Sequence, residues 1–176
     1  DHAELLATLP AAGKKGETME WTDAAPLNGI NTYYVVPCRV AGEIGMPDSV
    51  RCFSGNDAPA APLEAKATKL GDQSIKVDWK APNIGANNGY VNPASIKYIV
   101  TRQPDNVKVA DTDQTTFTDN TVTGDDFYYY EVQAYTNEGG KGGVATTEKV
   151  RAGLGLDTPQ KFNLFDENEA NRWTVE

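Results

Sequence analysis

Several segments of the chain alternate apolar and polar residues with a period of two. Ile75, Val77 and Trp79 alternate with charged neighbours, and similar alternation recurs in residues 96–102 and 128–134. A strand with one buried face requires this spacing, because successive side chains point to opposite faces of a sheet. The pattern therefore predicts three half-buried strands.

Shorter apolar segments, separated by turn-forming residues, add further strands to this pattern. They lie at residues 63–68, 107–110, 115–118 and 144–150. Helical periodicity is weak: a short helix competes only at residues 3–9, which read equally well as a strand, and at residues 166–172. Seven short strands at this spacing predict an all-β fold, a seven-stranded antiparallel sandwich of the immunoglobulin-like type.

The chain also contains two copies of one sequence pattern. Residues 21–23 (Trp-Thr-Asp) recur 96 residues later as residues 117–119 (Phe-Thr-Asp), and Tyr33 and Tyr128 lie 95 residues apart in similar surroundings. A unit of about 95 residues is large enough to bury its own core. The repeat therefore predicts tandem domains and makes Tyr33 and Tyr128 equivalent residues.

The repeat also sets the expected domain boundaries. A small, Pro-rich linker is expected at residues 58–62. Residues 62–152 have room for all seven strands, whereas residues 1–57 hold only the last four strands of a preceding copy, with unpaired edges and an uncovered apolar face. Residues 153–176 are expected to be a linker and the start of a further module. A chain that begins at Asp1 is expected to be a segment of a larger protein.

Residues 62–152 resemble a fibronectin type III domain. The resemblance is carried by Trp79 in the second strand, Tyr98 in the third, and the run from Tyr128 to Ala134 that precedes a Gly-containing loop. It implies that Tyr128, and by the repeat Tyr33, folds its hydroxyl back onto the preceding turn. The core residues expected in the two units are Trp21, Tyr33, Trp79, Tyr98, Tyr128, Tyr130 and Val132.

Two further resemblances concern location. Tandem copies with a Gly- and Asn-rich loop such as residues 84–89 look like those of large secreted or surface-anchored bacterial proteins. Residues 162–175 are similar to the start of a jelly-roll module of the cleaved-adhesin type. These resemblances imply an extracellular or cell-surface location. The implied partners are adjacent modules of the same parent protein and a host or surface protein or glycan.

Charge and composition exclude several classes of function. The formal net charge is −9, so a nucleic acid would be repelled, and no apolar run approaches the ~18 residues of a membrane helix. The single histidine, His2, lies at the terminus, so most histidine-based catalytic arrangements have no candidate base. Carboxylate pairs of the glycosidase type remain open on composition alone. We expect no enzyme activity and no cofactor.

Cys38 and Cys52 are a candidate disulfide. They fall on the last two strands of the first unit and lie symmetrically about Gly45, so a hairpin centred there would place them opposite each other. An exported protein would meet oxidising conditions. Two unbonded thiols are the alternative, because a slip of one residue breaks the pairing.

Four aromatic residues form a candidate ligand surface. Phe127, Tyr129 and Tyr135 are expected to point outward from the sixth strand, and Tyr90 lies in the long loop. Aromatic faces stack on sugar rings or on apolar groups of a protein partner. The alternative is that these side chains cover the domain's own loops or a neighbouring module.

Two other features favour structural explanations. Aspartates gather between residues 111 and 126, but without an Asp-x-Asp-x-Asp-Gly loop they are expected to form a solvated rim and no metal site. The glycines of residues 137–143 are expected to form a flexible hairpin. The function predicted overall is a non-catalytic spacer and interaction module. The alternative is an accessory segment of a secreted hydrolase or adhesin-type protease whose active site lies outside this chain.

Overall fold

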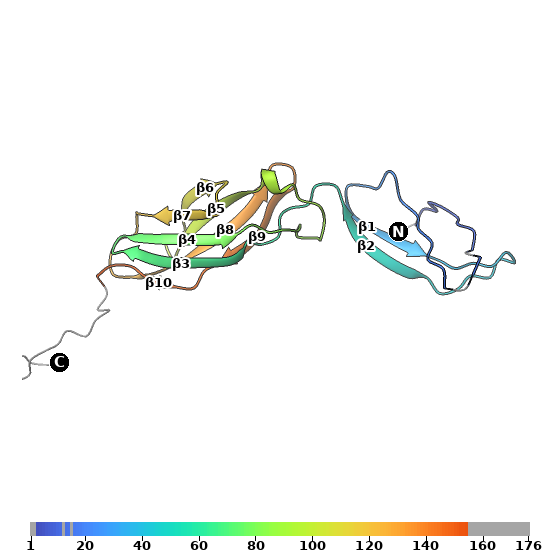
Figure 1. Ribbon diagram of the computed structural model, residues 1–176, viewed down its shortest axis with the longest axis horizontal. Coiled ribbons are helices and arrows are strands. Elements are labelled where there is room, and N and C mark those ends of the chain that lie inside the picture. Colours follow the sequence, from blue (N-terminus) through green and yellow to red (C-terminus); the bar gives the residue numbers. More distant parts are fainter. Residues whose placement is uncertain (1–2, 12, 15, 155–176) are drawn as a thin grey trace, which may run out of the picture.

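The computed structural model describes residues 3–11, 13–14 and 16–154 (Figure 1). Within them the chain is all-β, with one short 3-10 turn at Pro93–Ser95 and no α-helix, which confirms the predicted fold class. The strands are β1 (Gly29–Val35), β2 (Asp48–Ser54), β3 (Leu63–Gly71), β4 (Ser74–Lys80), β5 (Lys97–Gln103), β6 (Val107–Thr112), β7 (Thr116–Asp119), β8 (Phe127–Thr136), β9 (Gly140–Thr146) and β10 (Val150–Arg151). The predictions for residues 162–175 lie outside the described residues.

The second unit, β3 to β10, is a sandwich of two antiparallel sheets. One sheet has the order β3-β4-β7, and the other has the order β10-β8-β5-β6 with β9 also paired to β8. Because β9 and β10 both pair with β8, they act as one interrupted final strand. The result is the seven-stranded, fibronectin type III-like sandwich that the sequence pattern predicted.

The core lies between the two sheets. Alternate residues of the central strands β4, β5 and β8 point into it, as the period of two requires. Trp79 and Tyr98 meet edge to face, with ring centroids 5.3 Å apart. Burying each large apolar side chain contributes about 1.5–3 kcal/mol, so this layer is the main source of stability. Its buried hydrophobic members are Ile75, Val77, Trp79, Ile96, Tyr98, Val100, Val122, Tyr128, Tyr130, Val132, Ala134 and Ala152.

The first unit forms two strands in place of the four that the sequence predicted. β1 and β2 pair antiparallel from Gly29↔Ser54 to Val35↔Asp48, and residues 17–23 stay outside any strand. In the second unit the equivalent segment, β7, forms because it pairs with β4. The described part of the first unit has no counterpart of β4, so residues 17–23 have no partner.

Trp21 therefore does not occupy the core expected for it. Its side chain is 44% exposed, and it contacts Tyr33 only edge-on, with ring centroids 6.5 Å apart. The counterpart of Trp21 in the repeat, Phe117, packs against the buried core of the second unit. A facing sheet covers Phe117, whereas the described residues provide none for Trp21.

None of the described residues form a helix with the length and hydrophobicity that a membrane span needs.

Candidate functional site

In the structure the segment between β2 and β3 is residues 55–62, which we call the linker, and it packs against one end of the second sandwich. Asn56 forms a parallel bridge with Tyr90, and the Asp57 amide donates to the Tyr90 carbonyl at 2.9 Å. Farther along, the Ala60 amide donates to the carbonyl of Ile84 at 3.0 Å. We call this contact the joint: residues 56–61 against the loop of residues 84–90 and the first part of β9.

The Asp57 side chain is the centre of the joint. It is only 1% exposed. Its Oδ2 accepts hydrogen bonds from the backbone amides of Asn87, at 2.7 Å, and Gly89, at 3.0 Å. Its Oδ1 accepts from Asn87 Nδ2 at 2.9 Å. Asn88, between the two amide donors, has a φ of 61°, so the chain curls around the carboxylate. The loop is therefore held by an acid that belongs to the linker.

Two opposing effects act on the pKa of Asp57. Burial alone would raise it, but the hydrogen bonds from the Asn87 side chain and from the backbone of Asn87, Gly89 and Ala58 outweigh that effect. The pKa therefore lies below its ordinary value of 3.8. At neutral pH the carboxylate is ionised, and charge-assisted hydrogen bonds of this kind are stronger than neutral ones.

Glycines in β9 and immediately before it let the linker backbone come close. A Cβ placed on Gly142 would lie 1.9 Å from the carbonyl oxygen of Pro59, and one on Gly139 would lie 2.1 Å from that of Asp57. The Gly143 amide donates to the Pro59 carbonyl at 3.0 Å. The structure thus corrects the expected flexible hairpin: Gly140–Thr146 is strand β9, and its glycines make room for the joint.

A small hollow opens beside the joint. Its volume is about 150 Å³, and its lining residues include Asp57, Tyr90, Asn92 and Glu138. Pockets for small-molecule ligands usually measure about 300–1,000 Å³. The hollow is therefore smaller than a typical ligand site.

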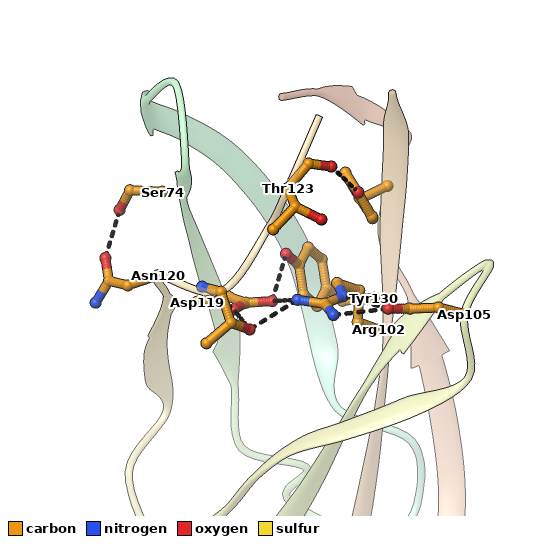
Figure 2. A network of polar contacts seen from close by, with 9 residues as sticks. Ser74, Arg102, Asp105, Asp119, Asn120, Thr123 and Tyr130 are labelled. Atoms are coloured by element: carbon orange, nitrogen blue, oxygen red, sulfur yellow. Dashed lines mark hydrogen bonds and ion pairs between the residues drawn. The ribbon is translucent and has the colours of Figure 1, made fainter. Parts of the chain in front are cut away.

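A second polar cluster lies inside the sandwich (Figure 2). Arg102 of β5 donates through Nη1 to Asp119 Oδ2 at 2.9 Å, and the Tyr130 hydroxyl of β8 donates to the same oxygen at 3.1 Å. Arg102 also forms an ion pair with Asp105 at 2.6 Å. The Tyr128 ring lies 5.6 Å from the guanidinium carbon. We call Arg102, Asp119 and Tyr130 the buried ion cluster.

The surroundings keep each member of this cluster in one protonation state. For Asp119, burial would raise the pKa, but hydrogen bonds from Thr121 and Arg102 lower it overall. Burial, and then the charge of Asp119, raise the pKa of Tyr130 well above its usual range. The hydrogen bond to Asp105 outweighs burial and raises the pKa of Arg102. Such groups do not exchange protons near neutral pH, so the cluster has the properties of a packing element and not of an acid–base catalyst.

The buried ion cluster changes the alignment of the repeat. The Tyr33 hydroxyl donates to Asp23 Oδ2 at 2.8 Å, as that of Tyr130 does to Asp119. Tyr128, by contrast, donates to the Thr123 carbonyl at 2.6 Å, the fold-back expected of it. Tyr33 is therefore the counterpart of Tyr130, 97 residues on, and the expected fold-back of Tyr33 onto the preceding turn is wrong. A shift of two residues keeps the side chain on the same face.

The two cysteines do not face each other. The register of the hairpin pairs Cys52 with Asn31, whereas Cys38 lies beyond β1 in a bridge with Ile44. Both thiols are free and exposed. The predicted disulfide is wrong because the hairpin is centred between residues 41 and 42 rather than at Gly45, a shift that takes Cys38 out of the paired strands.

We expect both thiols to react in the folded protein. A thiol-specific colorimetric reagent added without denaturant should titrate two groups per chain, because Cys38 and Cys52 are exposed. A Cys38→Ser variant is the control and should titrate one. Absence of reaction until a reductant is added would contradict the register of β1 and β2.

The structure does not gather the four candidate ligand-surface aromatics into one platform. Phe127 and Tyr135 lie near opposite ends of β8, and Tyr90 lies at the joint. The Tyr135 hydroxyl donates to Asp111 at 2.7 Å, and Lys149 Nζ lies 6.0 Å from the centroid of the Tyr129 ring. Tyr129 and Tyr135 do share one face of β8, and a ligand surface built on that pair stays a prediction.

The aspartates between residues 111 and 126 have separate partners. Asp119 belongs to the buried ion cluster, Asp111 pairs with Lys108 at 2.6 Å, and Asp125 pairs with Arg151 at 3.3 Å. Within the described part of the chain, no group of three or more His, Cys, Asp or Glu side chains is placed to hold a metal ion.

Comparison with known proteins gives partial matches. No protein-family profile matches the chain. The interleukin-6 receptor subunit beta of Rattus norvegicus is 28% identical over 106 residues, which cover 60% of this chain and 12% of that protein. The human protein of the same name is 26% identical over 112 residues, or 62% of this chain and 12% of that protein. The chain thus spans about one eighth of these relatives.

Solved structures with a similar fold cover different shares of the chain. Domains d3-d4 of the rat CD45 extracellular region match with a TM-score of 0.45 and 16% identity, covering 86% of this chain and 83% of that one. The fibronectin type-III domain of human fibronectin type III domain containing protein 3 matches with a TM-score of 0.44 and 21% identity, covering 62% of this chain and 98% of that one.

Proposed function

We propose that this chain is a non-catalytic spacer and interaction region of an extracellular protein, built from fibronectin type III-like modules. Its task is to hold adjacent modules of one parent protein in a set arrangement. The observation that carries the proposal is the joint, in which the buried Asp57 carboxylate accepts three hydrogen bonds from the second unit.

The joint favours a stiff connection over a loose tether. A Gly- and Ser-rich linker behaves as a random coil, because nothing holds its backbone. Here the linker backbone is bonded to the second unit at Asp57, Ala60 and Pro59, and glycines in β9 let it approach. Detaching the linker from the second unit would leave the Asp57 carboxylate and its amide donors without these partners.

The relatives support an extracellular place for the proposal. Both are receptor subunits by name, and the matched segment lies within proteins about eight times as long. The sequence also suggested a bacterial surface protein and contacts with glycans. The relatives come from rat and human. We therefore propose an extracellular module that contacts other proteins, and the proposal includes neither a bacterial origin nor contacts with glycans.

An Asp57→Asn variant tests the proposal. An amide offers one donor where the carboxylate had only acceptors, so at least one amide of the loop at residues 84–90 loses its partner. We expect the free energy of unfolding to fall by about 1–3 kcal/mol. We also expect a broader distance distribution between spin labels on Cys52 and on a Thr68→Cys position, measured by pulsed electron resonance in a Cys38→Ser background.

Asp113→Asn is the matched control, because Asp113 is an exposed acid whose carboxylate accepts a hydrogen bond from the neighbouring Gln114 and not from the linker. Unchanged distances in both variants would contradict a stiffening role for Asp57.

The acid response adds a second measurement. The folded-state pKa of Asp57 is lowered. The ionised carboxylate therefore contributes to the free energy of unfolding above pH 3.8, and this contribution is lost as the pH falls through the lowered pKa. The free energy of unfolding should therefore decrease less with falling pH in the Asp57→Asn variant than in the unchanged chain.

A further inference from the structure

The loop that surrounds the Asp57 carboxylate contains an asparagine followed directly by a glycine. The sequence has two such pairs, Asn28-Gly29 and Asn88-Gly89, and the second lies in this loop. Asparagine is thermolabile, because its side-chain amide can react with the backbone nitrogen of the next residue. A glycine in that next position hinders the reaction least, since it has no Cβ. Asn88 is therefore a candidate site of spontaneous deamidation inside the joint.

The reaction closes a ring between the side chain and the backbone. The Gly89 nitrogen loses its proton and bonds to Asn88 Cγ, the Cγ–Nδ2 bond breaks, and ammonia leaves with the proton. Water then opens the succinimide ring at either carbonyl and gives aspartate or isoaspartate. No oxidant or reductant takes part, and water is the only other reactant. The freedom of the Gly89 nitrogen to reach Cγ therefore sets the rate.

The joint holds that nitrogen in place. The Gly89 amide donates to Asp57 Oδ2 at 3.0 Å, and the same oxygen accepts from the Asn87 amide at 2.7 Å. The Asn88 amide donates to the Gly85 carbonyl at 3.0 Å, and the Gly85 amide donates to the Gly89 carbonyl at 3.1 Å. Rotation about the Asn88 Cα–C bond, which brings the Gly89 nitrogen onto Cγ, would break these bonds.

The Asp57 carboxylate also opposes loss of the amide proton. Its pKa lies below 3.8, so the carboxylate is much too weak a base to deprotonate a backbone amide. A negative charge beside the amide disfavours the amide anion that ring closure requires. The contact therefore slows the reaction in two ways, because it fixes the nitrogen and keeps the proton on it.

Packing explains why a reactive pair of residues lies in this loop. A Cβ on Gly89 would lie 2.9 Å from the Asp57 Cβ, and one on Gly85 would lie 2.6 Å from the same atom. Larger residues would therefore push the loop away from the linker. Isoaspartate would do the same, because it adds a carbon to the backbone between Asn88 and Gly89. Either product also adds a negative charge to the loop around Asp57, which like charges disfavour.

We propose that Asn88 is a deamidation site that the Asp57 carboxylate protects while the joint is closed. Detachment of the linker frees the Gly89 nitrogen to react, and the product prevents the linker from docking again. The release is permanent, since the hydrolysed side chain does not return to asparagine. This inference goes beyond the proposed function, because it rests on the contacts of Asp57 and not on the task of the modules.

The test compares deamidation at Asn88 in the full chain and in an Asp57→Ala variant. Both are incubated in mildly alkaline buffer and digested after lysine and arginine, and tandem mass spectrometry measures conversion at Asn88 in the peptide of residues 81–97. We expect Asn88 to react at least about tenfold faster in Asp57→Ala, because loss of a charged hydrogen bond shifts loop opening by such a factor. Asn28, measured in the same samples, should react at an unchanged rate.

Asp113→Ala is the matched control, because Asp113 is an exposed acid that accepts a hydrogen bond from Gln114 and not from the loop. It should leave the rates at Asn28 and Asn88 unchanged. If Asp57→Ala fails to fold, the unchanged chain is compared with a synthetic peptide of residues 81–97. Asn88 should then react at least about tenfold faster in the peptide, where no carboxylate holds the Gly89 amide.

The effect of the product is measured on the unchanged chain after long incubation. The chain deamidated at Asn88 carries an added negative charge, so anion exchange separates it from the intact chain. We expect faster hydrogen exchange at the amides of Asn87 and Gly89 in the deamidated chain, because these amides no longer donate to Asp57.

Two results would overturn the proposal. An unchanged or slower rate at Asn88 in Asp57→Ala would show that the carboxylate does not protect the site. Equal hydrogen exchange in the deamidated and intact chains would show that the product leaves the joint closed. Both results are distinct from failure of the spacer function, which the label distances in Asp57→Asn decide.

Discussion

An Asp119→Ala variant is expected to lose about 3–5 kcal/mol of the free energy of unfolding of the second unit. Asp119 is 1% exposed and accepts hydrogen bonds from Arg102 and Tyr130 through one oxygen and from Thr121 through the other. Its removal leaves a guanidinium in the interior without its buried counter-charge, and leaves the Tyr130 hydroxyl without an acceptor. The loss should appear in urea unfolding monitored by tryptophan fluorescence.

Asp105→Ala is the matched control for this prediction. Asp105 also pairs with Arg102, at 2.6 Å, but it is much more exposed than Asp119. Water can replace an exposed partner, so we expect a loss of about 1 kcal/mol or less. Adding Arg102→Met to Asp119→Ala should restore part of the stability, because the unpaired charge is then gone. Equal losses for Asp105→Ala and Asp119→Ala would contradict the assigned roles.

A Gly142→Val variant is expected to separate the linker from the second unit. A Cβ at this position would lie 1.9 Å from the Pro59 carbonyl oxygen, and a backbone atom cannot rotate away as a side chain can. Either the linker detaches or β9 shifts, at a cost of about 1–3 kcal/mol or somewhat more. The distance distribution between labels on Cys52 and a Thr68→Cys position should broaden beyond that of Asp57→Asn.

Lys141→Val is the control, because Lys141 is the exposed neighbour of Gly142 on β9. It introduces the same β-branched side chain on the solvent face, where it should not disturb the joint. A Gly142→Val variant with unchanged unfolding and unchanged label distances would show that the linker does not rest on β9 in solution, and the joint would lose its main support.

Local pattern predicted the second unit well, and the reason is visible in β4, β5 and β8. Each of these strands is covered on one face only. The alternation of Ile75, Val77 and Trp79 with polar residues therefore identifies the buried face of the strand directly from the sequence. The first unit was less predictable. Residues 17–23 match β7 in sequence, yet they form no strand, because a strand needs a neighbour that the described residues do not provide.

Register was the point at which sequence reasoning failed most clearly. Cys38 and Cys52 seemed symmetric about Gly45, but the turn lies elsewhere, so Cys52 is opposite Asn31. Tyr33 was matched to Tyr128, and its hydrogen bond to Asp23 makes it the counterpart of Tyr130 instead. The shift from Tyr128 to Tyr130 is of two residues and preserves the face, so a period of two cannot detect it. The shift in the hairpin depends on where the turn falls, which the alternation of residues does not fix.

The amino-acid sequence alone determined the all-β class, the repeat and the residues of the second core, because these follow from alternation and turn chemistry over a few residues. Only the tertiary structure decided that Asp57 holds a loop 30 residues away and that Gly142 makes room for the linker. It also decided that Asp119 joins Arg102 to Tyr130. Such contacts join distant segments whose approach depends on the packing of both sheets, and no local pattern records that approach.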